Sequence, residues 1–449
     1  MTIKTEDVLN KRIGRLYVHY LLPTLFATLM GSLYSLADLI FVGNGVGGEA
    51  LAAISIASPM YNIFSCLTCL IAGGANVMAI CLGEKDEEEA NQIFTLSILT
   101  LFGIGCVLLA GFQIFLEPIA RFLGADDALM PLVESYMRIV TLASPGFLVS
   151  WSIGNFIRND GNPNLVMWAS LIPNLFNILF DYVFVFVLNM GISGAALATA
   201  LSPVLGLLIQ FSHFYLHKNH IRFVRPHFTL RRLGRICRNG ASYFTQELSG
   251  AVAIYAYNTI MMGLGGSVMV SAYSVVMNVG WLSMSLVSGF MGGALPIIGI
   301  CLGAGRNERV RKAFHLAAVC SMIYAVVISA VILSFPEAVA TLFASGDPGV
   351  ITAAGSAGRL YFWGVLPAAL NMIVLSLAQA CEWNRQALLI SFSRSLVMLM
   401  LCLLAMSALF GQTGAWLSFP AAELLTLVLS AVIYMGLRRR LLCQRGTGV

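Results

Sequence analysis

Charged residues are scarce in this chain of 449 amino acids. Asp, Glu, Lys and Arg make up 10% of it, apolar residues make up 58%, and the mean hydropathy is +0.84. Soluble proteins carry about 25% charged residues, so this chain has too little polar surface to cover a soluble protein of its size. The composition therefore excludes a soluble enzyme, and it also excludes disordered, collagen-like and disulfide-scaffold proteins. The excess apolar surface must face lipid.

Several chemical signatures are also missing. The chain has no G-x-x-x-x-G-K-[ST] sequence, so it does not itself hydrolyse ATP. Residues 43–48 satisfy G-x-G-x-x-G, but they follow a membrane helix and no βαβ unit surrounds them. All six histidines lie at or near the ends of apolar segments, which argues against metal chemistry within the bilayer. We therefore expect no enzyme activity, no catalytic residues and no cofactor, and the dispersed net charge of +5 argues against nucleic acid.

Twelve apolar segments follow one another along the chain. Backbone groups in lipid need internal partners, so each segment is expected to be a transmembrane helix. With the N-terminus inside, 22 of the 26 Lys and Arg residues fall in inner segments and only Arg121 falls in an outer loop. This bias predicts that both termini are cytoplasmic. The approximate spans are 17–42, 51–82, 91–115, 132–157, 164–188, 193–216, 240–264, 270–301, 313–335, 351–380, 386–410 and 414–437.

The two halves of the chain resemble each other at a nearly constant shift in residue number. Cys81-Leu82-Gly83 recurs as Cys301-Leu302-Gly303, and many glycines recur at the same shift. Six helices per half give both halves the same orientation, so the repeat is parallel, about an axis along the membrane normal. We expect an all-α polytopic membrane protein of twelve transmembrane helices in two six-helix bundles related by a pseudo-two-fold axis. The expected parts are an N-terminal lobe (1–216), a basic cytoplasmic linker (217–239), a C-terminal lobe (240–437) and a basic cytoplasmic tail (438–449).

Two acidic residues, Asp38 and Asp181, lie within the apolar segments of the N-terminal half and have no acidic counterparts in the other half. A charged side chain in the bilayer costs about 2.5–3.5 kcal/mol on insertion scales, which suggests a function. Two carboxylates in a dry pocket either hold a proton or bind a hard cation such as Na+. The alternative is that both acids merely accept hydrogen bonds from neighbouring helices.

Oxygen-bearing side chains accompany these acids. Asn174, Asn177 and Asp181 recur at spacings of three and four, so they share one helix face. Asn155 and Thr199 on neighbouring helices can add oxygen ligands. The predicted cation-coupling site consists of Asp38, Asp181, Asn177, Thr199, Asn155 and Asn174, with Na+ at Asp38 and Asp181 as the only metal considered.

Three further charged residues, Glu247, Arg394 and Glu423, lie deep within apolar segments of the C-terminal half. Glu247 and Arg394 have two interpretations, a buried ion pair between their helices or a substrate-contacting acid, while Glu423 has no evident partner. Tyr34, Met261 and Tyr273 are candidates for lining an adaptable substrate cavity, with ordinary packing as the alternative. Pro23 permits a kink in the first helix, either as a hinge controlled by Asp38 or as a static bend.

The sequence resembles the MATE (multidrug and toxic compound extrusion) transporters over nearly its whole length. Within that family it looks most like the DinF-like bacterial branch. The similarity is carried by Pro23 followed by Ala37-Asp38-Leu39-Ile40-Phe41-Val42-Gly43, by Asp160-Gly161-Asn162-Pro163, by Pro173-Asn174-Leu175-Phe176-Asn177 leading to Asp181, and by Gly191-Ile192-Ser193-Gly194-Ala195-Ala196. The resemblance implies a two-lobe exporter with an N-lobe cation site at Asp38, Asn177, Asp181 and Thr199. Some members have a second acidic site on helices 7 and 10, but helix 10 has no buried acid here.

The function implied by the resemblance is antiport of cationic, amphipathic drugs against Na+ or H+ by alternating access. We expect small-molecule partners and membrane lipid, no obligate protein partner, and a monomer, in the inner membrane of a bacterium. A flippase for lipid-linked saccharides is the alternative, but its anionic cargo requires several central basic residues and only Arg394 qualifies. The sequence does not distinguish Na+ from H+ or name the substrate.

Overall fold

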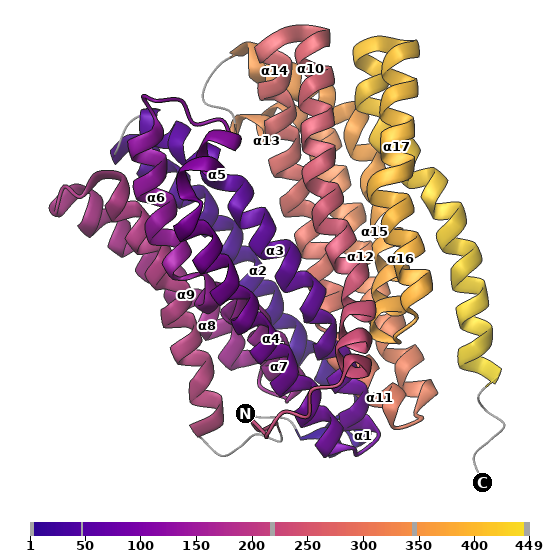
Figure 1. Cartoon of the computed structure of the whole chain (residues 1–449). Helices are drawn as coiled ribbons and strands as arrows, with labels where there is room; N and C mark the ends of the chain where they lie inside the picture. The colour runs from indigo at the N-terminus through magenta and orange to yellow at the C-terminus, as the bar shows by residue number, and fades with distance from the viewer. Residues whose placement is uncertain (1–3, 46–47, 216–220, 344–347, 444–449) are drawn as a thin grey trace. The chain divides into compact units, whose positions relative to one another are not determined.

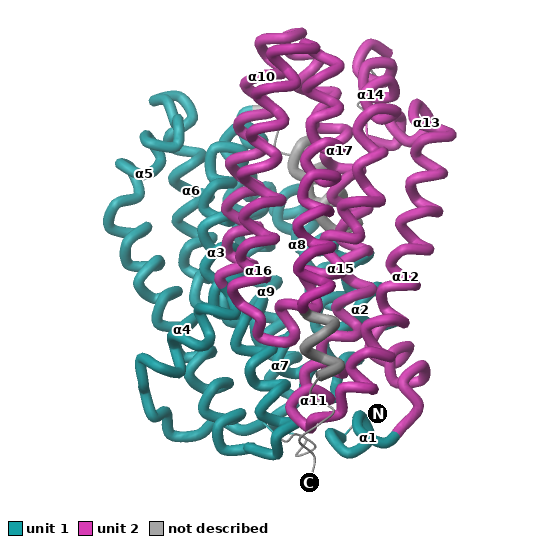
Figure 2. The backbone as a smooth tube through the Cα atoms, turned by 90° about the vertical axis from the view of Figure 1, so that its right-hand side faces the viewer, with its two compact units in different colours: residues 1–10, 22–240 teal, residues 11–21, 241–449 magenta. Residues whose placement is uncertain are grey.

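The structure is a computed structural model that describes the backbone of residues 4–45, 48–215, 221–343 and 348–443, and the side chains of 4–31, 49–215, 221–343 and 348–436. The regular structure of these residues is entirely helical. The chain forms two compact units, shown in Figure 2. Unit 1 contains Met1–Asn10 and Leu22–Gly240, and unit 2 contains Lys11–Leu21 and Ala241–Val449.

Unit 1 holds the first half of the helices (Figure 1). They are α1 (Thr5–Asn10), α2 (Ile13–Gly45) from Leu22 onward, α3 (Gly48–Gly83), α4 (Glu87–Ile114), α5 (Leu116–Phe122), α6 (Met130–Leu142), α7 (Ser144–Asn159), α8 (Pro163–Asp181), the π-helix η1 (Tyr182–Val187), α9 (Gly191–Tyr215) and the first turns of α10 (Leu230–Gly292).

Unit 2 holds the second half and the first turns of α2. Its helices are the remainder of α10, α11 (Leu295–Gly303), α12 (Asn307–Ser334), α13 (Pro336–Thr341), α14 (Pro348–Tyr361), the 3-10 helix η2 (Phe362–Gly364), α15 (Val365–Ala380), α16 (Asn384–Phe392), the π-helix η3 (Ser393–Val397) and α17 (Met398–Cys443).

The helix boundaries repeat between the two halves. The end of α3, Gly83, corresponds to the end of α11, Gly303. The same shift in residue number carries both ends of α4 onto those of α12. It also carries the start of α5 onto the start of α13. The starts of later elements follow with slips of one or two residues, as between α6 and α14 and between α8 and α16. The repeat predicted from the sequence is therefore present in the secondary structure.

Several spans are interrupted. Eight segments of the described residues are long and apolar enough to cross a membrane, or nine if the α6–α7 pair, bent by 53°, counts as one span. Two of these segments each contain two helices, since α10 is kinked at Gly265–Gly266 and α17 at Gly411. With α2, the described part of the chain has twelve membrane-crossing helices or bent helix pairs. The expected spans 132–157 and 351–380 are thus broken, by Ala143 and by η2 respectively.

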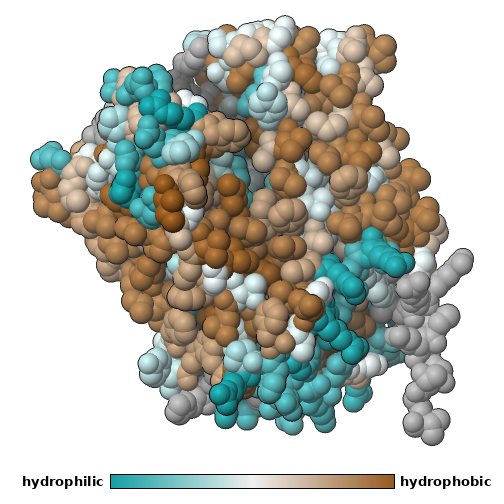
Figure 3. Space-filling view, viewed as in Figure 1, coloured by the Kyte–Doolittle hydropathy of each residue, from teal (hydrophilic) through white to brown (hydrophobic). Residues whose placement is uncertain are grey.

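Aromatic and aliphatic side chains form a separate core in each unit. In unit 1, Phe94 packs edge-on against Phe156, with ring centroids 5.4 Å apart. In unit 2, Tyr361 stacks on Phe419 at 4.4 Å. Large apolar side chains are also exposed, among them Val107 at 71%. Figure 3 shows apolar side chains over much of one face, with hydrophilic ones gathered along its lower edge and at its upper left, as a lipid-facing protein requires.

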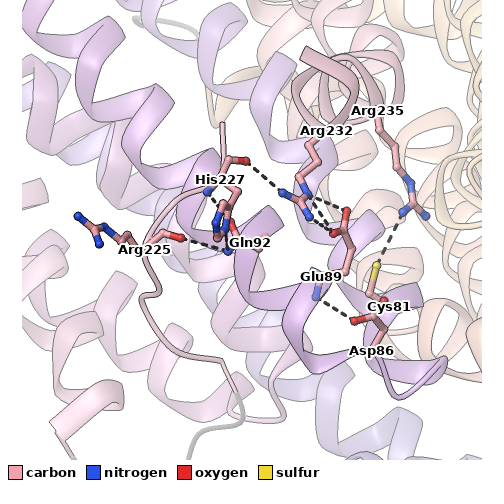
Figure 4. A network of polar contacts seen from close by, with 8 residues as sticks. All are labelled: Cys81, Asp86, Glu89, Gln92, Arg225, His227, Arg232 and Arg235. Carbon is pink, nitrogen blue, oxygen red and sulfur yellow. Dashed lines mark hydrogen bonds and ion pairs between the residues drawn. The ribbon is translucent and has the colours of Figure 1, made fainter. Parts of the chain in front are cut away.

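Residues 221–240, which fall largely within the expected basic linker, pack on unit 1 rather than standing apart from it (Figure 4). Gln92 of α4 donates to the carbonyl of Arg225 and accepts from the backbone N–H of His227. Arg232 of α10 forms an ion pair of 2.7 Å with Glu89, beside the Asp86 side chain that caps α4. These contacts join α10 to the α3–α4 turn. The units therefore begin and end at different residues from the expected lobes.

Candidate functional site

A cavity of about 630 Å³ lies within unit 1. It is bounded by α7, α8 and α9, with contributions from α2, α3 and α6. Three residues of the predicted cation site line it: Asn155 from α7, Asn174 from α8 and Thr199 from α9. Each is half-buried. The structure thus brings these three residues of the predicted set around one cavity, whose volume falls in the range of about 300–1,000 Å³ that suits a drug-sized ligand.

The start of α8 explains the register of its polar face. Asn162 is the N-cap, since its side chain accepts from the backbone N–H of Leu165, and Pro163 occupies the first helical position. From this start the helix turns Asn174, Asn177 and Asp181 to one side. Asn177 and Asp181 are both fully buried, at 0% exposure. Neither amide atom of Asn177 has a hydrogen-bond partner among the described residues.

The backbone of α8 changes geometry immediately after Asp181. The π-helix η1 begins at Tyr182, and the N–H of Leu188 donates to the carbonyl of Val183 over 2.8 Å. Such π-helical insertions occur frequently at functional sites because they widen the turn and redirect side chains. In unit 2, η3 carries Arg394. In unit 1 the π-helix follows the buried Asp181, and in unit 2 it contains the half-buried Arg394. The sequence did not predict either π-helix.

Part of the predicted site falls in α2. The backbone of Asp38 and Tyr34 is helical, but their side chains lie outside the described residues. Pro23 is buried inside α2, and the division between the two units falls one residue before it, between Leu21 and Leu22.

The charged residues of unit 2 pair differently from the expected arrangement. Arg394 contacts Glu423, with Nε 2.7 Å from Oε1, whereas Glu247 is exposed. Glu423 also accepts from Asn371 of α15 over 2.7 Å. The Glu247–Arg394 pair is therefore wrong, and so is the view that Glu423 lacks a partner. The physical reason is that α17 packs against η3 and presents Glu423 to the guanidinium.

Met261 and Tyr273 belong to the core of unit 2, with 0% and 2% exposure. Tyr273 stacks on Tyr257 with ring centroids 4.8 Å apart and planes 9° from parallel. Tyr257 in turn shares a hydrogen bond of 2.6 Å with Ser418. This arrangement fits the packing alternative for both residues.

The cavity also has lining residues that the sequence did not point to, and two of them are polar residues near one another. Arg158 of α7 and Gln210 of α9 both line it. Arg158 lies three residues after Asn155 and seven after Trp151, which also lines the cavity. Positions with these spacings share one helix face, so this pattern was available in the sequence. Arg158 was instead counted as one of the cations at the inner end of its helix.

The described residues contain no group of three or more His, Cys, Asp or Glu side chains placed to hold a metal ion. Long apolar helices around a cavity, as in unit 1, are typical of a polytopic membrane transporter.

The sequence profile of the MatE family matches residues 23–183 and 250–404, and the chain belongs to this family. It is 22% identical to the multidrug export protein MepA of Staphylococcus haemolyticus, over 97% of this chain and 96% of that protein. It is 24% identical to MepA of Staphylococcus aureus strain NCTC 8325, over 94% of each chain. A crystal structure of a MATE protein in complex with MaD3S matches the whole chain at a TM-score of 0.90 and 22% identity.

Proposed function

We propose that this protein is a secondary multidrug antiporter, which exports cationic amphipathic compounds in exchange for Na+ or H+ by alternating access. The observation that carries the proposal is the polar face of α8. It places Asn174 at a drug-sized cavity and buries Asn177 and Asp181 completely on the same helix face. The MepA proteins are named as multidrug exporters, which supports the same class of cargo.

The coupling step follows from the cost of burying a carboxylate. An ionised acid with no access to water is strongly disfavoured unless it takes up a proton or a cation. Carboxylate, amide and hydroxyl oxygens are the ligands that hard cations prefer. Asp181, Asn177 and Thr199 provide one of each kind, and we propose that Asp38 provides a second carboxylate. Asn155 and Asn174 lie at the cavity and add amide oxygens.

The movement is proposed to occur in α2. Residues Lys11–Leu21 group with unit 2, and the helix from Leu22 onward groups with unit 1. Pro23 lacks the N–H that would continue the helical ladder, so the helix is weakest at this junction. In this proposal, ion occupancy at Asp38 biases α2 between a straight and a bent form. Met261, Tyr273 and Tyr34 remain candidates for contact with cargo in other states of the cycle.

We further propose that the protein lies in the inner membrane of a bacterium with both termini in the cytoplasm, where the Lys and Arg residues concentrate. A parallel repeat within one chain makes a monomer sufficient. The flippase alternative is not favoured, because the relatives are drug exporters. A diphosphate would also require several basic residues, and the described lining of the unit 1 cavity contains one.

The test is drug resistance in a bacterial host that lacks its own efflux pumps. The intact protein should raise the inhibitory concentration of cationic dyes and drugs, and Asp181→Asn and Asp38→Asn should each abolish the increase while the protein still reaches the membrane. Asp127→Asn is the matched control, because it makes the same change at a carboxylate whose side chain is 90% exposed, and it should leave resistance intact. Full resistance in both Asp→Asn variants would contradict the coupling site.

A further inference from the structure

Among the described residues that line the unit 1 cavity, the charge is opposite to that expected for a site that binds cations. Arg158 is the only charged side chain among the described residues that line it. The other polar lining groups are neutral amides and hydroxyls, and no described acid lines the cavity. Because an arginine stays protonated at any physiological pH, the cavity has a fixed positive charge on one wall.

No carboxylate of the described residues neutralises this charge. The nearest acid in sequence, Asp160, lies two positions on and is bound by His213 at 2.8 Å. The ion pairs found among the described residues do not include Arg158. A partly buried guanidinium with five N–H groups and no acidic partner is well suited to an anion that enters from the cavity.

A second observation at the same end of the cavity also points to a ligand. Gln210 is 4% exposed, and its Oε1 atom has no hydrogen-bond partner among the described residues. Gln210 lies beside the α7 face that carries Arg158, since a Cβ atom on Gly154 would be 3.4 Å from its Nε2 atom. A buried amide oxygen without a partner is costly. A bound molecule that offers a hydroxyl or N–H group would satisfy it.

The remaining walls suit a flat apolar body. Tyr61 and Tyr136, joined through their hydroxyl groups at 2.9 Å, line the cavity together with Phe147 and Trp151. Phe147 and Trp151 meet edge to face at 5.7 Å. Aromatic faces provide contact area for ring systems. The cavity therefore combines an aromatic wall with one cation, a pattern that fits a ring compound bearing a single anionic group.

We propose that the unit 1 cavity binds amphipathic ring compounds through a carboxylate that pairs with Arg158, so that, among cationic cargo, compounds that also carry a carboxylate are preferred over purely cationic ones. This inference rests on the proposed export function and narrows its substrate class. The planar guanidinium forms two parallel hydrogen bonds to a carboxylate. A purely cationic compound meets a like charge at the same place. The competing explanation is that Arg158 only complements the C-terminal end of α7, where cations are favoured in any helix.

Two dyes that differ in one group separate these explanations. Rhodamine B carries a free carboxylate and a delocalised cation, and its ethyl ester masks the carboxylate. Binding of each dye to the purified full-length protein in detergent is measured by fluorescence anisotropy. We expect the intact protein to bind the acid at least fivefold more tightly than the ester. Arg158→Gln should weaken binding of the acid at least tenfold and change binding of the ester less than twofold, while Arg158→Lys should retain part of the preference.

The matched control is Arg138→Gln, which removes an exposed arginine of α6 paired with Glu134 and should leave both dyes unaffected. Arg158→Lys provides the second variant if Arg158→Gln is not folded, because a lysine keeps the charge but loses the two parallel hydrogen bonds, and it should reduce the preference for the acid. Equal weakening of both dyes, unchanged binding of the acid in Arg158→Gln, or no binding of either dye to the intact protein would overturn the proposal. Displacement of the acid by phosphatidylglycerol would assign the cation to a lipid headgroup and would also overturn it.

Dye export from cells separates this inference from the proposed function. If cells export the ester while the purified protein shows no preference for the acid, the carboxylate inference fails and the exporter remains. If cells export neither dye and gain no resistance to any drug, the proposed function fails, and the anisotropy result still reports whether Arg158 selects a carboxylate.

Discussion

The buried ion pair of unit 2 gives a prediction whose magnitude follows from the structure. Arg394 and Glu423 are 2.7 Å apart, and their side chains are 12% and 4% exposed. Replacing Arg394 with Met leaves the Glu423 carboxylate buried without its guanidinium. Replacing Glu423 with Met leaves the Arg394 guanidinium buried without its carboxylate. In the double variant both positions are apolar, and Asn371 keeps its hydrogen bond to the backbone carbonyl of residue 423.

The expected energies follow from burial. Unit charges about 4 Å apart at an effective dielectric of about 20 attract by about 4 kcal/mol, and removing one partner of a buried pair destabilises by about 3–5 kcal/mol. Each single variant should therefore be less stable than the intact protein by an amount in this range. Replacing both partners by apolar residues of similar volume is often neutral or even stabilising. The double variant should therefore be close in stability to the intact protein, because no charge is left unpaired.

The assay is thermal unfolding of the full-length protein in detergent, followed by tryptophan fluorescence. For a unit of about 200 residues, a loss of about 3 kcal/mol lowers Tm by about 6–12 °C. Arg138→Met is the control, because the Arg138–Glu134 pair is exposed on both sides and such pairs contribute less than about 1 kcal/mol. If the double variant is as unstable as the two single variants added together, the pair does not interact as described.

Three further predictions concern packing and hydrogen bonds. Gly240→Ala should sharply reduce the folded yield in size-exclusion chromatography, because its Cβ would overlap the backbone of Leu70, whereas Gly111→Ala, with no atom within 4 Å, should leave the yield unchanged. Tyr257→Phe should lower stability by about 1 kcal/mol, measured by thermal unfolding, because it removes the hydrogen bond to Ser418. His213→Phe should lower the stability of the protein by about 1–3 kcal/mol in the same assay, since it removes the partner of the buried Asp160. A smaller loss of stability than that of Tyr257→Phe would contradict this.

The architecture could be predicted because lipid restricts the backbone conformations that a chain can adopt. Long apolar runs have to be helices, and the tripeptide repeated at Cys81 and Cys301 gives the same shift that separates the ends of α3 and α11. The start of α10 could not be predicted in this way. Its first turns are basic and amphipathic, and they are helical because they pack on α4 through Arg232 and Glu89.

The polar face of α8 could also be predicted, because helical spacing alone puts Asn174, Asn177 and Asp181 on one side, and two of these residues are fully buried. The choice of partner for Arg394 could not. It depends on which helix packs against η3, and the hydropathy of the chain does not encode that choice. No local sequence signal predicts the π-helix that follows Asp181.

The central claim is that an ion held at Asp38 and Asp181 drives export. The most direct test is uptake of a fluorescent cationic dye into proteoliposomes after a jump in Na+ concentration or pH, with intact protein and with Asp181→Asn. The intact protein should accelerate dye movement when one of the two gradients is imposed, and Asp181→Asn should exchange dye at a rate that neither gradient changes. A variant that responds to the gradient as strongly as the intact protein would contradict the claim.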